Sequence, residues 1–265
     1  MHAKITRPAQ QNHPPRFLFY GPRKQGRTAL TASAGQGKVL ILDPEWGTAW
    51  MKSAKSNPHV WHIEEWSEIE EFLQYVRSGQ HDYTWIGIDN LTRLLKLALY
   101  FVIKRAPDSA LNRVIQPISL PKRGQANDLV ITMINRLRRL PIGLIYTAGE
   151  RILTNKQEVD GEKSINNHVV NGEEEDTPIV DIGTDIRYVP DLTDEVRRFI
   201  VGDVDLIGRL YATHNEEGEL ERRLWVAPND AYDTGYRSLY RLPEYIQRPS
   251  VPRIVTLLEK GKNNG

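Results

Sequence analysis

The sequence predicts an α/β protein in which helices flank a mainly parallel sheet, with a β-hairpin in the C-terminal part. Two observations carry this prediction. Short apolar runs of strand length alternate with segments of helical periodicity between residues 16 and 147. A glycine-rich loop follows the first apolar run directly and precedes a predicted helix. Continuous apolar runs are typical of strands buried on both faces, and strand–helix alternation produces parallel sheets.

The expected elements follow in chain order. Strands are expected at about 16–21, 38–43, 59–63, 83–89 and 142–147, and helices at about 28–34, 67–77, 91–104 and 126–140. Later come a hairpin from 204–212 and 220–226 around the turn 215–218, and a short helix at 254–260. Residues 106–124 contain Pro117 and Pro121, and residues 152–178 are polar, show no sustained periodicity and contain the acidic run 173–176. We expect loops in both segments, because stretches this long without structure usually bind something or are disordered.

Composition excludes several classes of function. The chain has 265 residues, of which 40% are hydrophobic and 26% charged, and its net charge is +1. It has no cysteine, which excludes disulfides, thiol catalysis and zinc–thiolate sites. No apolar run is long enough to span a membrane, and residues 1–15 do not resemble a signal peptide, so we expect a cytoplasmic protein. We expect residues 1–15 to be flexible and 16–265 to form one domain.

The glycine-rich loop has the spacing of a phosphate-binding P-loop. It reads Gly21-Pro22-Arg23-Lys24-Gln25-Gly26-Arg27-Thr28 and is followed by Ala29. In such a loop, backbone N–H groups surround the phosphates, a lysine reaches the terminal phosphates and a hydroxyl holds magnesium. The lysine position is Arg27, which keeps the charge but replaces a compact ammonium with a planar fork. The alternative is a plain glycine turn that caps a helix.

Two acids come at the ends of predicted buried strands. Asp89 ends the strand at 83–89, where a magnesium-supporting acid belongs in P-loop proteins. Thr28 on magnesium directly and Asp89 through coordinated water form a coherent pair. The alternative for Asp89 is a turn or helix-cap residue. Glu45 follows the strand at 38–43 and could activate the water that attacks the terminal phosphate. Asp43 is a rival for that role, and a solvated loop acid is the alternative reading of Glu45.

These motifs together resemble those of the phage-encoded, RecA-like AAA-type ATPases in the Sak group of single-strand annealing proteins. The resemblance rests on the glycine loop, Asp43-Pro44-Glu45-Trp46-Gly47, Asp89-Asn90 and the strand from 142 with the polar residues after it, and it covers about 16–260. It implies a RecA-like P-loop core that binds ATP and Mg²⁺, with Glu45 as catalytic base and Arg27 neutralising phosphate charge. It also implies a DNA-dependent ATPase in the host cytoplasm that promotes annealing or strand exchange in phage recombination.

The chain departs from that pattern at two positions. The P-loop lysine is Arg27, with Lys24 nearby as partial compensation, and the polar sensor after the fourth strand corresponds to Gly149 beside Glu150. Both departures affect hydrolysis more than phosphate binding. Two other functions therefore stay open: a nucleotide-gated DNA-binding or scaffold protein with little hydrolysis, and an unrelated P-loop NTPase or kinase.

The resemblance also implies partners and their contacts. DNA-contacting loops correspond by position to 106–124 and 151–178, whose basic residues are expected to meet the phosphates of single-stranded DNA: Lys122, Arg123, Arg151, Lys156 and Lys163. Solvated loop charges are the alternative. A homo-oligomer, as a ring or filament, is expected, with Arg237 as the residue reaching a neighbouring subunit's phosphates. A single-strand-binding protein is a further expected partner, and no membrane is involved.

Overall fold

The computed structural model describes residues 13–51, 56–104, 119–154 and 186–260. Its centre is a nine-stranded sheet in the order β11-β9-β8-β1-β5-β4-β2-β3, with β10 paired to β8. The six strands from β8 to β3 run parallel: β8 (Leu206–His214), β1 (Arg16–Tyr20), β5 (Gly143–Ala148), β4 (Trp85–Ile88), β2 (Val39–Asp43) and β3 (His59–His62). Within the described residues, the predicted α/β class with a mainly parallel sheet is confirmed.

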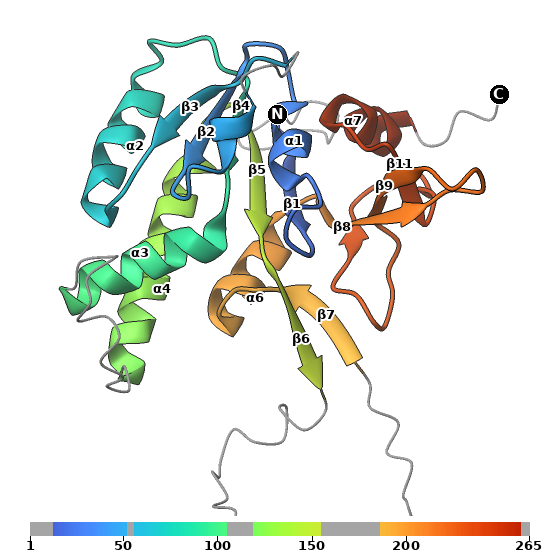
Figure 1. Ribbon diagram of the computed structural model, residues 1–265. Coiled ribbons are helices and arrows are strands. Elements are labelled where there is room, and N and C mark those ends of the chain that lie inside the picture. The colour runs from blue at the N-terminus through green and yellow to red at the C-terminus, as the bar shows by residue number, and fades with distance from the viewer. Residues whose placement is uncertain (1–12, 52–55, 105–118, 155–185, 261–265) are drawn as a thin grey trace, which may run out of the picture.

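Antiparallel strands extend one side of this sheet. The hairpin of β8 and β9 (Leu220–Trp225) confirms the prediction for the C-terminal part, and β11 (Tyr245–Gln247) forms the edge. β10 (Gly235–Tyr236) pairs with the start of β8. A separate two-stranded arm, made by β6 (Glu150–Thr154) and β7 (Ile186–Pro190), extends away from the main sheet (Figure 1).

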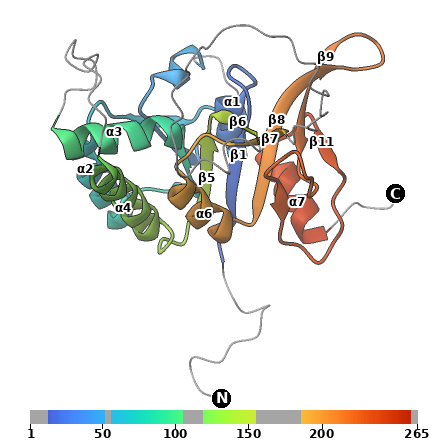
Figure 2. The same ribbon diagram turned by 90° about the horizontal axis from the view of Figure 1, so that it is seen from below.

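Alternating residues of the central strands divide the core between two faces. Leu18, Leu40 and Tyr146 belong to the cluster that packs on α2 (Ile69–Ser78), α3 (Leu91–Ile103), α4 (Leu120–Leu137) and α6 (Asp194–Asp203). A second cluster, which contains Phe17 and Ile41, lies on the opposite face with α1 (Arg27–Ala32) and α7 (Val251–Lys260). The strands are apolar at every position because successive side chains of a buried strand enter opposite cores. Figure 2 shows α2, α3 and α4 grouped on one side of the molecule.

Two predicted boundaries are wrong. The helix expected at 126–140 begins at Leu120 and ends at Leu137, so the last five residues of the expected loop 106–124 are helical. Pro121 lies in the first turn of α4, where a missing N–H group and a fixed φ suit a helix. Arg151 and residues 152–154, expected in a loop, belong to β6, whose partner β7 is more than 30 residues away in sequence. Short 3-10 turns, η2 (Gly47–Trp50) and η3 (Trp66–Glu68), complete the described elements.

Some expectations fall outside the described residues. These are most of the N-terminal segment 1–15, the loop part 106–118, and 155–178 with Lys156, Lys163 and the acidic run. Among the described helices, none is long and apolar enough to cross a membrane.

Candidate nucleotide site

The glycine-rich loop connects the end of β1 to α1 in a conformation that needs its glycines. Gly21 has φ 149°, and a Cβ atom there would lie 2.2 Å from the backbone oxygen of Leu210 on β8. Gly26 has φ 95° and is the N-cap residue of α1, with no side chain capping the helix. The first N–H groups of α1 therefore lack a side-chain acceptor, which is the local condition for binding an anion.

A cavity of about 260 Å³ opens beside this loop and brings the predicted residues together. Three connections that follow parallel strands build it, because the carboxyl ends of β1, β2 and β4 meet at one edge of the sheet. Its lining comprises Lys24, Gln25, Gly26, Arg27, Thr28, Ala29, Glu45, Gly47, Met51, Asp89 and Asn90. Of the predicted loop residues, Gly21, Pro22 and Arg23 lie outside this lining. Gln25 Oε1 is buried without a hydrogen-bond partner in the described part of the chain.

Asp89 lines the cavity and is only 7% exposed. Its Oδ1 accepts a hydrogen bond of 2.5 Å from the Thr147 hydroxyl, and the Thr28 hydroxyl is also bonded to it. Burial raises the pKa of Asp89, while the two hydroxyls and the charge of Arg27 act in the opposite direction. A desolvated carboxylate beside a hydroxyl is a pair of hard oxygen donors suited to a divalent cation.

Asp43 and Glu45, the rival acids, have different surroundings. Asp43 is completely buried and binds the following turn: its carboxylate accepts from the N–H groups of Glu45, Gly47 and Thr48 and from the Thr48 hydroxyl, at 2.7–3.2 Å. Glu45 is exposed and lines the cavity, and its Oε2 accepts a hydrogen bond of 2.7 Å from Asn90 Nδ2. Asp43 thus shapes the loop, and Glu45 is the acid that faces the cavity.

Arg27 bridges two strand ends beside the cavity. Its Nη1 donates to the carbonyl of Gly21, after β1, and to the carbonyl of Ala148, at the end of β5, the latter at 2.7 Å. Burial lowers the pKa of Arg27, whereas the charges of Asp89 and Glu45 oppose that effect. The guanidinium therefore supports the loop through backbone contacts while it lines the cavity.

A family model described as an AAA domain matches residues 13–238. The chain belongs to this AAA domain family. No curated protein sequence matches the chain. Among solved structures, a KaiC-like protein of the hyperthermophilic archaeon Pyrococcus horikoshii OT3 is similar over 89% of each chain, with 10% sequence identity and a TM-score of 0.39. A similarity this distant carries no conclusion about function.

The AAA domain also places an arginine beside the P-loop that the sequence did not indicate. The side chain of Arg222 on β9 packs directly against Gly26. A Cβ atom on that glycine would lie 2.8 Å from Arg222 Nε. Its side chain has no hydrogen-bond or ion-pair partner among the described residues. A second cavity of about 360 Å³ lies here and shares Gly26 and Ala29 with the first. Only strand pairing brings Arg222 to this place, so no motif could have revealed it.

Some of the residues predicted to contact DNA lie in other elements, and closer together, than the sequence indicated. Lys122 and Arg123 were expected on a loop but lie in the first turns of α4, for the reason given above. Arg123 and Arg151, expected on separate loops, line one cavity of about 220 Å³ together with Lys96 of α3. Arg151 also donates a 2.5 Å hydrogen bond to Asp194.

Two further predicted positions lie in surroundings that the sequence did not indicate. Arg237 follows β10 at the start of β8, so it lies at the sheet edge opposite the P-loop of its own chain, and its Nη2 donates to the carbonyl of Gly202 at 2.6 Å. Glu150, beside the sensor position, forms a largely buried ion pair with Arg209 at 2.6 Å. The Arg209 guanidinium lies over the ring of Tyr188, 4.8 Å from its centroid.

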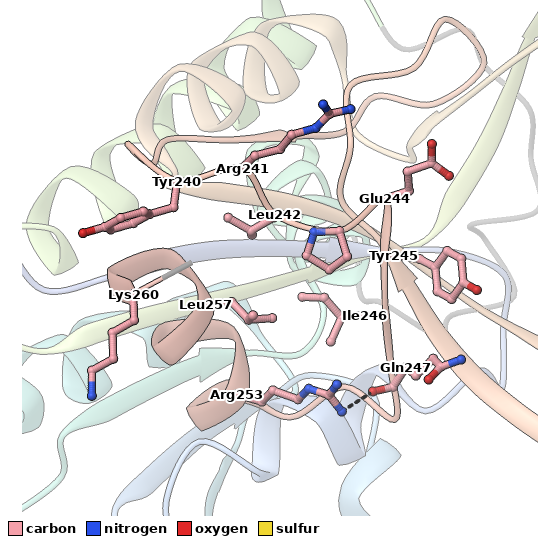
Figure 3. Close-up of a pocket in the computed structure, with 11 residues that line it drawn as sticks. Tyr240, Arg241, Leu242, Glu244, Tyr245, Ile246, Gln247, Arg253, Leu257 and Lys260 are labelled. Atoms are coloured by element: carbon pink, nitrogen blue, oxygen red, sulfur yellow. Dashed lines mark hydrogen bonds between the residues drawn. The ribbon is translucent and has the colours of Figure 1, made fainter. Parts of the chain in front are cut away.

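A cavity larger than the one beside the P-loop lies elsewhere in the chain, among residues that follow the matched segment 13–238. It has a volume of about 790 Å³ and lies between the segment 240–247 and α7, at the β11 edge of the sheet. Figure 3 shows Tyr240, Arg241 and Lys260 around it, with Arg253 bonded to the Gln247 carbonyl. None of the predicted site residues lines it. Cavity size therefore does not mark the P-loop site, whose cavity is about 260 Å³.

Proposed function

We propose that this AAA domain binds ATP with magnesium at the P-loop, hydrolyses it, and acts on single-stranded DNA. The observation that carries the proposal is the shared cavity of the P-loop, Glu45 and Asp89. Each of these three comes from a different strand end, and together they supply phosphate-binding amides, an acid facing the phosphates and a metal-supporting carboxylate.

The residues divide the work of hydrolysis. Backbone amides of 23–28 cradle the phosphates, and Arg27 neutralises part of their charge. Thr28 and Asp89 would hold Mg²⁺, which when bound would neutralise charge on the phosphate oxygens. Among the described residues no group of three or more His, Asp or Glu side chains could hold a metal. Glu45 accepts the proton of the attacking water.

Glu45→Gln tests the assignment of the base. We expect kcat for phosphate release to fall about 10²- to 10⁴-fold, the usual contribution of a general base, while ATP affinity changes little. Glu64→Gln is the matched control, because Glu64 is an exposed acid that follows β3, the neighbour of β2, and does not line the cavity. Unchanged turnover in Glu45→Gln would contradict the proposed mechanism.

A second function, nucleotide-gated binding with little hydrolysis, is favoured by the contacts of Arg27. Its Nη1 is committed to two carbonyl groups, so the guanidinium is less free than a lysine ammonium to follow charge on the terminal phosphate. Arg27→Lys separates the two functions. A large gain in ATP turnover would favour the gated binder, whereas unchanged or reduced turnover would favour an adapted enzyme.

Single-stranded DNA as partner is supported by the basic residues around one cavity, Lys96, Arg123 and Arg151. We propose that they contact phosphates, and that a ring or filament of AAA domains promotes annealing or strand exchange, as the resemblance to the Sak group implies.

Lys96→Glu should weaken binding of a fluorescent oligonucleotide and reduce the salt dependence of log K by about 0.7 per lost contact. Lys260→Glu on α7 should not. No binding and no stimulation of ATP turnover would instead favour a kinase or another NTPase.

A further inference from the structure

Asn90 connects the N-terminus of α3 to the acid that faces the nucleotide cavity. Its Oδ1 accepts the N–H of Arg93 at 2.9 Å and so caps α3, and its Nδ2 donates to Glu45 Oε2 at 2.7 Å. We propose that Asn90 is the positioning residue for Glu45, orienting its carboxylate for the attacking water. This inference rests on the proposed function, in which Glu45 is the base.

The helix cap decides which way the Asn90 amide faces. An amide has one acceptor and one donor end, and the N–H of Arg93 requires the oxygen. The NH₂ group must then face Glu45. Because Asn90 is only 7% exposed and α3 is packed into the core through Leu91 and Leu94, this donor has a fixed place relative to Asp89, its neighbour in sequence.

Glu45 needs such a contact because it lies on an exposed turn. Asp43 fixes the backbone of that turn by accepting the N–H of Glu45, but this leaves the Glu45 side chain free to rotate. Asn90 is the one hydrogen-bond donor to the Glu45 carboxylate among the described residues. It holds Oε2, leaves Oε1 for a water molecule, and cannot itself take the proton. Orientation of this kind contributes to the rate without contributing to nucleotide affinity.

Asn90→Asp is the sharpest test, because aspartate has the same shape and caps helices equally well. It replaces the donor by an oxygen that repels Glu45. We expect kcat to fall about 10- to 100-fold, part of what the base itself contributes, with KM for ATP within about threefold of the wild-type value. Asn90→Ser, which keeps a capping oxygen and adds no charge, should lose about 10-fold and serves if the aspartate variant does not fold.

A double-mutant cycle distinguishes positioning from a structural role. In the Glu45→Gln background, Asn90→Asp should change the residual turnover by less than about twofold, because the carboxylate it acts through is gone. Asn127→Asp is the matched control: Asn127 is equally buried, at 7% exposed, and donates to the carboxylate of Glu195 at 2.8 Å. It should leave turnover in the absence of DNA unchanged.

The outcomes are separable. Wild-type turnover that is lost in Glu45→Gln but unchanged in Asn90→Asp overturns the inference alone. The inference is also overturned if Asn90→Asp lowers turnover equally in the wild-type and Glu45→Gln backgrounds. It is overturned as well if Asn127→Asp lowers turnover as much as Asn90→Asp does. Absence of any ATP turnover in the wild type overturns the proposed function and this inference together.

Discussion

Replacing Asp43 by alanine should destabilise the fold, whereas replacing Glu45 by glutamine should not. The Asp43 carboxylate accepts four hydrogen bonds and is completely inaccessible to solvent. Its removal leaves three N–H groups and the Thr48 hydroxyl without their acceptor. Each unsatisfied group would lower the free energy of unfolding by about 1–3 kcal/mol if no water replaced the carboxylate. Gly47 lies on an exposed turn, where water can replace the lost acceptor. We therefore expect the free energy of unfolding to fall by about 3–5 kcal/mol in total.

Thermal unfolding followed by circular dichroism measures this effect. For a domain of this size, 1 kcal/mol corresponds to about 2–4 °C, so Tm should fall by about 6–20 °C in Asp43→Ala. Glu45→Gln should unfold within about 2 °C of the wild-type protein, because its side chain is exposed and loses little. An Asp43→Ala variant as stable as the wild type would refute the assignment of Asp43 as the residue that shapes the turn.

Three other substitutions test the site and its surroundings. Gly21→Ala should prevent accumulation of folded protein, because its Cβ would lie 2.2 Å from the Leu210 oxygen; a soluble variant with unchanged Tm would contradict this. Arg209→Met should cost about 3–5 kcal/mol in urea unfolding, since it leaves the Glu150 carboxylate buried without a counter-charge, and adding Glu150→Gln should restore part of the loss. For Asp89, burial raises the pKa above the unfolded value of 3.8, so the charged form costs stability increasingly as pH rises above about 4. Without magnesium, Asp89→Asn should therefore melt higher than the wild type at pH 8, with a smaller difference near pH 5, and the opposite trend would be evidence against the stated cause.

Local sequence was sufficient for the central strands and the loop between the first strand and helix. The apolar runs around Phe17 and Ile41 predict strands because a strand buried on both faces must be apolar at every position. The spacing of Gly21 and Gly26 predicts the loop because positive φ and close backbone approach leave few alternatives. Arg27 was visible as a departure, but its bonds to the carbonyls of Gly21 and Ala148 were not, since Ala148 lies on another strand.

The sequence by itself determined the α/β class, the glycine loop and the acids at two strand ends, because each depends on neighbours within a few residues. Only the tertiary structure shows that Asp43 binds the following turn whereas Glu45, two residues later, lines the cavity. It also shows that Asn90 donates a hydrogen bond to Glu45 and that the Arg222 side chain packs against Gly26. Those contacts join segments 45 to about 200 residues apart, and the order in which strands pair, which no local pattern encodes, brings them together.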